Sequence, residues 1–198
     1  MREWWLRTLL VLSSPSATFA ALRRDGPDEL SDRAEPVLAL VLLGGVAYAL
    51  SSSAAAHLLD DGDYDGVLVA VWVFIAGAVS GLFAYWLLGA VLHGSVRALG
   101  SHGAFRRSRH ILAFASVPIA CSLVLWPVKL ALYGERPFRD GGALGRGGLV
   151  FTLAGLLFAV WAAALLVVGV RAVHGWTWPR AALAAAAPIA LAAVLLVV

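Results

Sequence analysis

Five long runs of apolar residues set the strongest limit on how this chain folds. The runs cover residues 36–59, 67–92, 111–133, 149–170 and 181–198. An α-helix rises about 1.5 Å per residue, so about 20 apolar residues cross the roughly 30 Å hydrocarbon core of a bilayer. The runs therefore predict an all-α fold: a polytopic membrane helical bundle of five transmembrane helices over residues 36–198.

The composition agrees with a membrane protein. Hydrophobic residues make up 61% of the chain and charged residues 14%, whereas soluble domains have roughly 45–50% and 25%. The net charge of +3 would be compatible with nucleic-acid binding in a soluble protein. No recognition helix or stacking aromatic group accompanies the arginines, however, so we expect no nucleic-acid partner.

The positive residues between the runs predict the orientation in the membrane. The tail 1–35 and the loops 93–110 and 171–180 hold eleven of them, whereas the segments 60–66 and 129–146 hold four. An excess of Lys and Arg marks the cytoplasmic side, so the N-terminus is expected inside and the C-terminus outside. Arginine outnumbers lysine by 14 to 1, a bias typical of GC-rich bacterial genomes. The expected location is therefore the bacterial inner (cell) membrane.

The stretch GSHGAFRRSRHILAFASVPIA leads into the third run and carries Arg106, Arg107 and Arg109. Its arginines are first of all the positive flank that keeps this loop in the cytoplasm. Clustered cytoplasmic arginines also attract anionic lipids, by about 1 kcal/mol per charge. We therefore expect these three residues to contact membrane lipid headgroups.

Residues 1–35 are predicted to form cytoplasmic interfacial helices and a linker. The segment 1–12, with two adjacent tryptophans, is expected to lie on the membrane surface. A second short helix follows, and it carries Phe19 and Leu22 on one face. That face rests either on the bilayer or on the bundle. An acidic linker then leads to the first run.

The loop between the first two runs contains DGDYDG and matches the first half of a calcium-binding loop. Asp61, Asp63 and Asp65 would supply the carboxylates. The second half does not match, because the position of the bidentate acid is Trp72. The prediction is a weak calcium site at most, and the alternative is a solvated acidic turn between two helices.

Small residues and prolines inside the runs point to helix packing. Gly77 and Gly81 form a GxxxG pair, which lets two helices approach closely within one chain or between two copies in a homo-oligomer. Pro118 and Pro127 are expected to kink the third run. A kinked helix frees backbone carbonyls, and this supports an alternative function: permeation or transport of a small molecule or lipid around the third span.

Catalysis is not expected. Ser80 lies midway along the second run, but all five histidines lie at the ends of runs or in loops, so no general base stands at its depth. The histidine spacings match no metal motif, and no cofactor is expected. Ionisable residues are also missing near the middle of every run, which argues against ion-coupled transport.

Three stretches resemble the Yip family of five-span membrane proteins, named for interacting with Ypt/Rab GTPases. They are SPSATFAAL, GSHGAFRRSRHILAFASVPIA and FAVWAAALLVVGVRAVHGWTWPRAAL. The residues standing at the family's recurring positions are Pro15, Thr18, Phe19, Gly103, Phe105, Pro118, Trp161, Gly169, Val173, His174, Gly175 and Arg180. Together the stretches extend over most of the chain, although each motif is short.

The resemblance implies five helices, a cytoplasmic N-terminus and no enzymatic activity, in agreement with the charge count. Eukaryotic relatives are partners of small GTPases in vesicle traffic between ER and Golgi. This sequence lacks their long N-terminal region and has a bacterial composition, so that role is not carried over. The leading hypothesis is interaction with lipids or with an unknown membrane or cytoplasmic protein, in membrane organisation. The contact face would comprise residues 1–35, 93–110 and 171–180.

Overall fold

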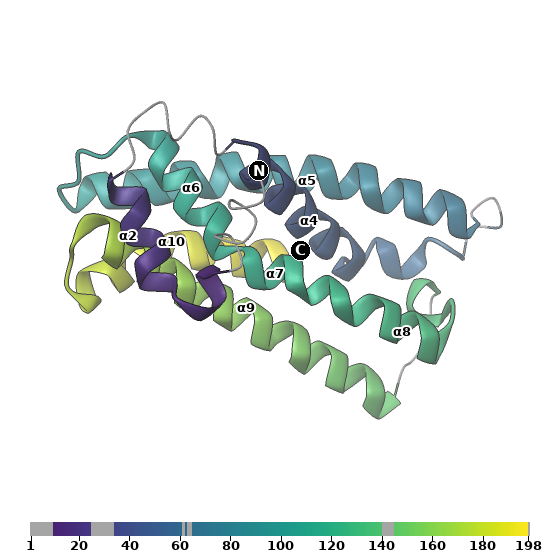
Figure 1. The fold of residues 1–198 in the computed structure, drawn as a ribbon. Helices are drawn as coiled ribbons and strands as arrows, with labels where there is room; N and C mark the ends of the chain where they lie inside the picture. The colour runs from purple at the N-terminus through teal and green to yellow at the C-terminus, as the bar shows by residue number, and fades with distance from the viewer. Residues whose placement is uncertain (1–9, 25–33, 61, 63–64, 140–144, 198) are drawn as a thin grey trace.

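The computed structural model describes residues 10–24, 34–60, 62, 65–139 and 145–197, and every regular element in this part of the chain is helical (Figure 1). The α-helices are α2 (Pro15–Arg24), α4 (Ala34–Ser51), α5 (Gly66–Ala98), α6 (Phe105–Ala115), α7 (Val117–Cys121), α8 (Leu125–Tyr133), α9 (Gly145–His174) and α10 (Trp178–Val197). Three 3-10 turns join them: η1 (Ala55–His57), η2 (Ser122–Val124) and η3 (Arg136–Phe138).

Four helical segments are long and apolar enough to cross a membrane: Gly66–Ala98, Phe105–Tyr133, Gly145–His174 and Trp178–Leu195. Their outer faces are apolar as well as exposed. On α5, Phe74, Val79 and Phe83 are 63%, 64% and 60% exposed. Soluble proteins rarely expose so long an apolar stripe to water. The prediction of an all-α helical bundle of a membrane protein is confirmed, with four candidate spans by length and hydropathy.

The helix expected over residues 36–59 is shorter than predicted, because α4 ends at Ser51. Two serine hydroxyls bond back to carbonyls of the preceding turn: Ser51 Oγ donates to Ala47 O at 2.9 Å and Ser52 Oγ to Ala49 O at 2.7 Å. The Ser52 amide also donates to Ala49 O, three residues back. These bonds replace the α-helical pattern and stop the helix. Hydropathy alone does not predict that a helix ends at such a position.

The third span is interrupted twice. Helix α6 ends before Ser116, and α7 begins with Val117 and the buried Pro118, which has no amide hydrogen to donate to the preceding turn. The 3-10 turn η2 follows, and α8 then takes Pro127 in its first turn. The proline positions thus coincide with the breaks. Figure 1 shows α6, α7 and α8 as successive, bent pieces of one crossing.

Helices α4 and α5 make the closest contact between helices that we find in the described chain. A Cβ atom built on Gly45 would lie 1.9 Å from Gly77 O, and one built on Gly81 would lie 2.3 Å from Val41 O. A Cβ on Gly77 would lie 2.7 Å from Val46 Cα. The structure therefore places Gly77 and Gly81 against the backbone of α4, where only hydrogen fits.

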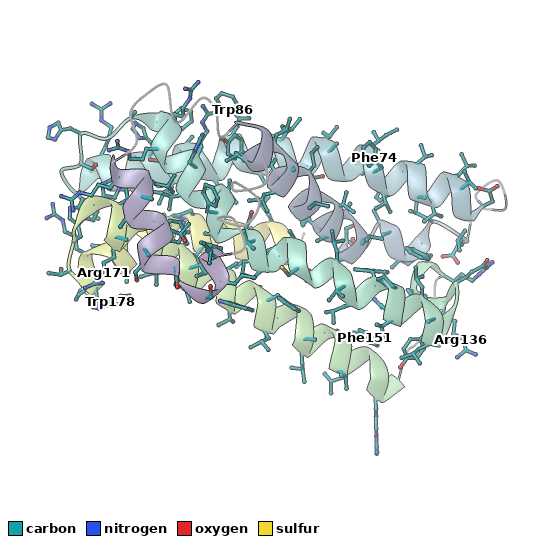
Figure 2. All side chains as sticks on the ribbon, viewed as in Figure 1. Phe74, Trp86, Arg136, Phe151, Arg171 and Trp178 are labelled. Carbon is teal, nitrogen blue, oxygen red and sulfur yellow. The ribbon has the colours of Figure 1, made fainter. Side chains whose placement is uncertain are left out.

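The two ends of the bundle are built from different elements; Figure 2 labels Arg171 at one end and Arg136 at the other. The arginine-rich end, as we call it, combines α2, the C-terminal end of α5, α6 and the α9–α10 turn. The acidic-loop end combines η1, the start of α5, α8 and η3 (Figure 1). Helix α2 packs on α9, with Phe19 and Leu22 buried in the protein core. This face of α2 was expected to rest on the bilayer or on the bundle, and it contacts the bundle. The predicted surface helix over 1–12 lies largely outside the described residues.

The glycine contact generates a paired prediction on neighbouring positions of α4. Gly45→Ala should lower the free energy of unfolding by about 1–3 kcal/mol, because the new methyl group meets the α5 backbone and forces the helices apart. Gly44→Ala should have no such cost, since nothing lies within 4 Å of its Cβ position. Thermal unfolding in one detergent measures both. Equal melting temperatures for the two variants would contradict the close contact.

Candidate interaction surface at the arginine-rich end

The core of this end is a notch on α9 that receives the ring of Phe19. A Cβ on Gly169 would lie 2.9 Å from Phe19 Cε1 and 2.9 Å from Ile111 Cγ2. Phe19 and Ile111 are both fully buried. The missing side chain at Gly169 thus lets α2, α6 and α9 meet at one point. This contact joins the three stretches that carry the family resemblance.

Above the notch, the α9–α10 turn is closed by Gly175 in a left-handed conformation, with φ of +66°. Its amide donates to Arg171 O at 2.8 Å, as does that of Trp176 at 3.2 Å, a C-cap arrangement that favours glycine. The guanidinium of Arg23 lies against this turn: a Cβ on Gly175 would be 3.2 Å from its Nη1. Helix α2 therefore contributes a positive charge directly to the turn.

The loop between α5 and α6 is tied to the same turn. Ser101 Oγ lies 3.1 Å from Nδ1 of His174 and accepts the Gly103 amide at 3.2 Å. Arg180 donates from Nη2 to Leu99 O. The Ser101–His174 and Arg180–Leu99 bonds join residues more than 70 positions apart, so the loop and the turn form one surface.

Aromatic rings hold the basic groups of this surface in place. The Trp176 ring stacks on His174 with centroids 4.8 Å apart, and it also lies 4.4 Å from the guanidinium carbon of Arg180. Arg171 lies over Trp178 at 4.4 Å, and Figure 2 shows this pair at the tip of the bundle. Such cation–π contacts are worth about 0.5–2 kcal/mol each.

Arg109 is held most tightly. Its guanidinium carbon lies 3.9 Å from the Trp86 ring, 4.8 Å from Phe105 and 5.1 Å from Tyr85. Its aliphatic stem crosses Gly89, where a Cβ would be 2.5 Å from Arg109 Cγ. The structure therefore places Arg109 in an aromatic cage between α5 and α6. Arg106, in contrast, is exposed.

Several buried nitrogen atoms at this end have no hydrogen-bond partner in the described chain: Nε of Arg107, Arg109 and Arg171, and Nε2 of His174. Buried polar groups are normally satisfied, by a ligand or water if not by protein. The positive charges of Arg107 and Arg23 also act on His174. This neighbourhood is therefore electropositive.

The other predicted site residues lie elsewhere. Asp65 caps α5, accepting the amides of Val67 at 2.9 Å and Leu68 at 2.8 Å, while Asp61 and Asp63 fall outside the described residues. Among the residues that are described, no group of three His, Cys, Asp or Glu side chains could hold a metal ion. The calcium site stays a prediction.

Sequence reasoning missed the aromatic partners of the arginines. Trp86 lies inside the second apolar run, more than 20 residues from Arg109, and no local pattern links them. The tryptophans of HGWTWPR gave a signal that could have been used. Alternating aromatic and basic residues in a tight turn favour cation–π stacking.

The fold and this surface define a class: a multi-pass helical membrane protein with an arginine-rich end. The family model described as the Yip1 domain matches residues 9–198, nearly the whole chain. The chain therefore belongs to the Yip1 domain family, which confirms the family predicted from its motifs. No curated protein and no solved structure matched it.

The notch predicts opposite effects for two glycines of α9. Gly169→Ala should destabilise the protein by about 1–3 kcal/mol, since its methyl group overlaps the Phe19 ring and Ile111. Gly155→Ala should be neutral or stabilising by up to about 1 kcal/mol, because nothing lies near it and alanine favours helix. Melting temperatures of the purified variants decide the matter, and a Gly169→Ala variant as stable as wild type would count against the docking of α2.

Proposed function

We propose that this chain is a non-enzymatic, five-span inner-membrane protein that organises membrane components by binding anionic groups at its arginine-rich end. The first of these partners is the headgroup of anionic lipids. The end faces the cytoplasm, with the N-terminus inside and the C-terminus outside, and α4 with the segment to Asp60 supplies the fifth crossing. Membership of the Yip1 domain family, which is not an enzyme family, supports the non-enzymatic assignment.

One observation carries the proposal: among the described side chains the arginine-rich end has seven arginines and no carboxylate, whereas at the acidic-loop end three carboxylates offset Lys129, Arg136, Arg139 and Arg146. The three carboxylates whose side chains are described, Asp60, Asp65 and Glu135, belong to the acidic-loop end. The arginines of the other end that have described side chains are Arg23, Arg97, Arg106, Arg107, Arg109, Arg171 and Arg180. A concentration of positive charge of this kind attracts the negatively charged cytoplasmic leaflet.

The arrangement also supports different roles, structural or lipid-binding, for different arginines. Arg109 and Arg180 are engaged by aromatic rings and a backbone carbonyl, which suits a structural role. Arg106 and Arg107 lie beside each other on the first turn of α6; Arg106 is exposed, and Arg107 Nε, like Nε of Arg109, is buried without a hydrogen-bond partner in the described chain. A phosphate oxygen is the acceptor that such guanidinium groups prefer. We therefore assign headgroup binding chiefly to Arg106 and Arg107.

Native mass spectrometry of the protein in a neutral detergent tests this assignment. Wild type should retain phosphatidylglycerol or cardiolipin in preference to phosphatidylcholine. The double variant Arg106→Gln, Arg107→Gln should lose about thirtyfold in affinity for anionic lipid, since each charge near the surface contributes about 1 kcal/mol and about 1.4 kcal/mol is a factor of ten. Added salt should weaken the wild-type preference as well.

The matched control is the double variant Arg136→Gln, Arg146→Gln, which removes two exposed positive charges at the acidic-loop end. It has the same net charge as the test variant and should retain anionic lipid as wild type does. Equal losses in both double variants would mean that only net charge matters, and the assigned surface would be wrong.

A protein partner could use the same surface, and crosslinking in the native host would identify contacts at 93–110 or at the N-terminal helices. The exposed faces of α5 and α9 leave room for a second copy of the chain. The alternative function, permeation around the third span, is supported by the breaks at Ser116 and η2, and it stays a prediction.

A further inference from the structure

A cavity of about 300 Å³ with a mixed polar and apolar lining lies between α4, α5 and the end of α10, away from the arginine-rich end. Its hydroxyl groups come from Tyr48, Ser51, Ser52, Ser53 and Ser80, and Trp72 adds an aromatic wall. Figure 1 shows the C-terminus about midway along the bundle rather than at its tip. Consistent with this, Leu195 lines the cavity and its carbonyl accepts the Tyr48 hydroxyl at 2.9 Å.

On the proposed topology the cavity extends from the end of the α10 crossing at Leu195 toward the middle of α5 at Ser80. Trp72 and Ser80 are six and fourteen residues from the start of α5 at Gly66, which places them about 9 Å and 21 Å along the helix axis. Ser80 is at the middle of the apolar run 67–92. The irregular chain after Ser51 runs along the same stretch. Non-helical backbone at this depth is tolerated where it is covered by protein or lines a water-filled cavity.

Three of the five hydroxyl groups around the cavity already donate their hydrogens within the protein: those of Tyr48, Ser51 and Ser52, to the carbonyls of Leu195, Ala47 and Ala49. The Ser52 oxygen also accepts the Ala55 amide at 3.3 Å. Toward a ligand the Tyr48 and Ser51 oxygens are therefore acceptors. Helices α4 and α10 both end here, and helix C-termini carry partial negative charge and free carbonyl groups. An acceptor-rich, negatively polarised cavity favours a cation or a hydrogen-bond donor.

We propose that this cavity binds the ammonium group of a small organic cation, with oxygens of Tyr48, Ser51 and Ser80 around the charge and the Trp72 ring against it. Two observations select this class. The described lining contains no carboxylate, whereas calcium and magnesium sites are built around carboxylates. The volume and the aromatic wall suit an alkylammonium group, which binds aromatic faces through cation–π contacts.

Cysteine accessibility in nanodiscs tests the proposal on the full chain. The only native cysteine, Cys121, is first replaced by alanine. Ser80→Cys and Val79→Cys then put thiols at the same depth on different faces of α5. Val79 is 64% exposed on the outer surface, where lipid would surround it. Cys at 80 should react with a water-soluble cationic methanethiosulfonate, and Cys at 79 should not, because a thiolate does not form in hydrocarbon.

The ligand class is tested with charge and competition. Relative to a free thiol in solution, Cys at 80 should favour the cationic reagent over its anionic analogue by about tenfold. Ethylammonium chloride should slow the reaction by about tenfold more than sodium chloride at equal ionic strength. Discs of phosphatidylglycerol contain no amine. Protection that appears on adding phosphatidylethanolamine instead of the soluble amine would assign the ammonium group to a lipid.

The remaining outcomes overturn the proposal. If Cys at 80 and Cys at 79 are equally inert, the cavity is dry. If Cys at 80 reacts without preference for the cationic reagent, or if sodium chloride protects as well as ethylammonium chloride, the cavity is only a hydrated recess. Unfolding curves of both unreacted variants verify that they are folded. The result is independent of the lipid assay, since neither residue belongs to the arginine-rich end.

Discussion

A helix that ends inside an apolar bundle must find other partners for its last backbone groups, and this constraint shapes the molecule around Ser51. The Ser51 and Ser52 hydroxyls donate hydrogen bonds to carbonyls in the preceding turn of α4, and the Tyr48 hydroxyl donates to a carbonyl at the end of α10. The hydroxyl hydrogens are used for this purpose, so oxygen lone pairs are left over. The early end of α4 therefore accounts for both the irregular segment and the acceptor-rich cavity beside it.

The sequence predicted the helices better than their ends. The runs 67–92 and 149–170 lie inside α5 and α9, which extend to Ala98 and His174. Hydropathy measures where apolar residues stop, whereas helical hydrogen bonding continues through polar residues such as Arg97 in the last turn of α5. The opposite error over 36–59 has a local cause, since serine hydroxyls that compete with the helix leave mean hydropathy almost unchanged.

The arginine-rich end was predictable as a charge pattern and not as a geometry. Counting charges identified Arg106, Arg107 and Arg109 together, yet their surroundings differ, because Trp86 and Gly89 of α5 create a cage for Arg109 alone. The family resemblance singled out Phe19 and Gly169 without saying why. Their contact explains it: a ring from one segment fills the space that a glycine leaves in another, and only tertiary packing brings the two together.

Helix α5 connects the two ends physically. It presents Gly77 and Gly81 to α4, Ser80 to the cavity and Gly89 to the stem of Arg109. All these contacts depend on the rotation of α5 about its own axis, since one residue of slippage turns a side chain by about 100°. The glycine contacts with α4 fix this rotation because no other register lets the two backbones approach so closely. The small residues that give the helices their shortest separation therefore also determine which side chains face the cavity and which support the arginines.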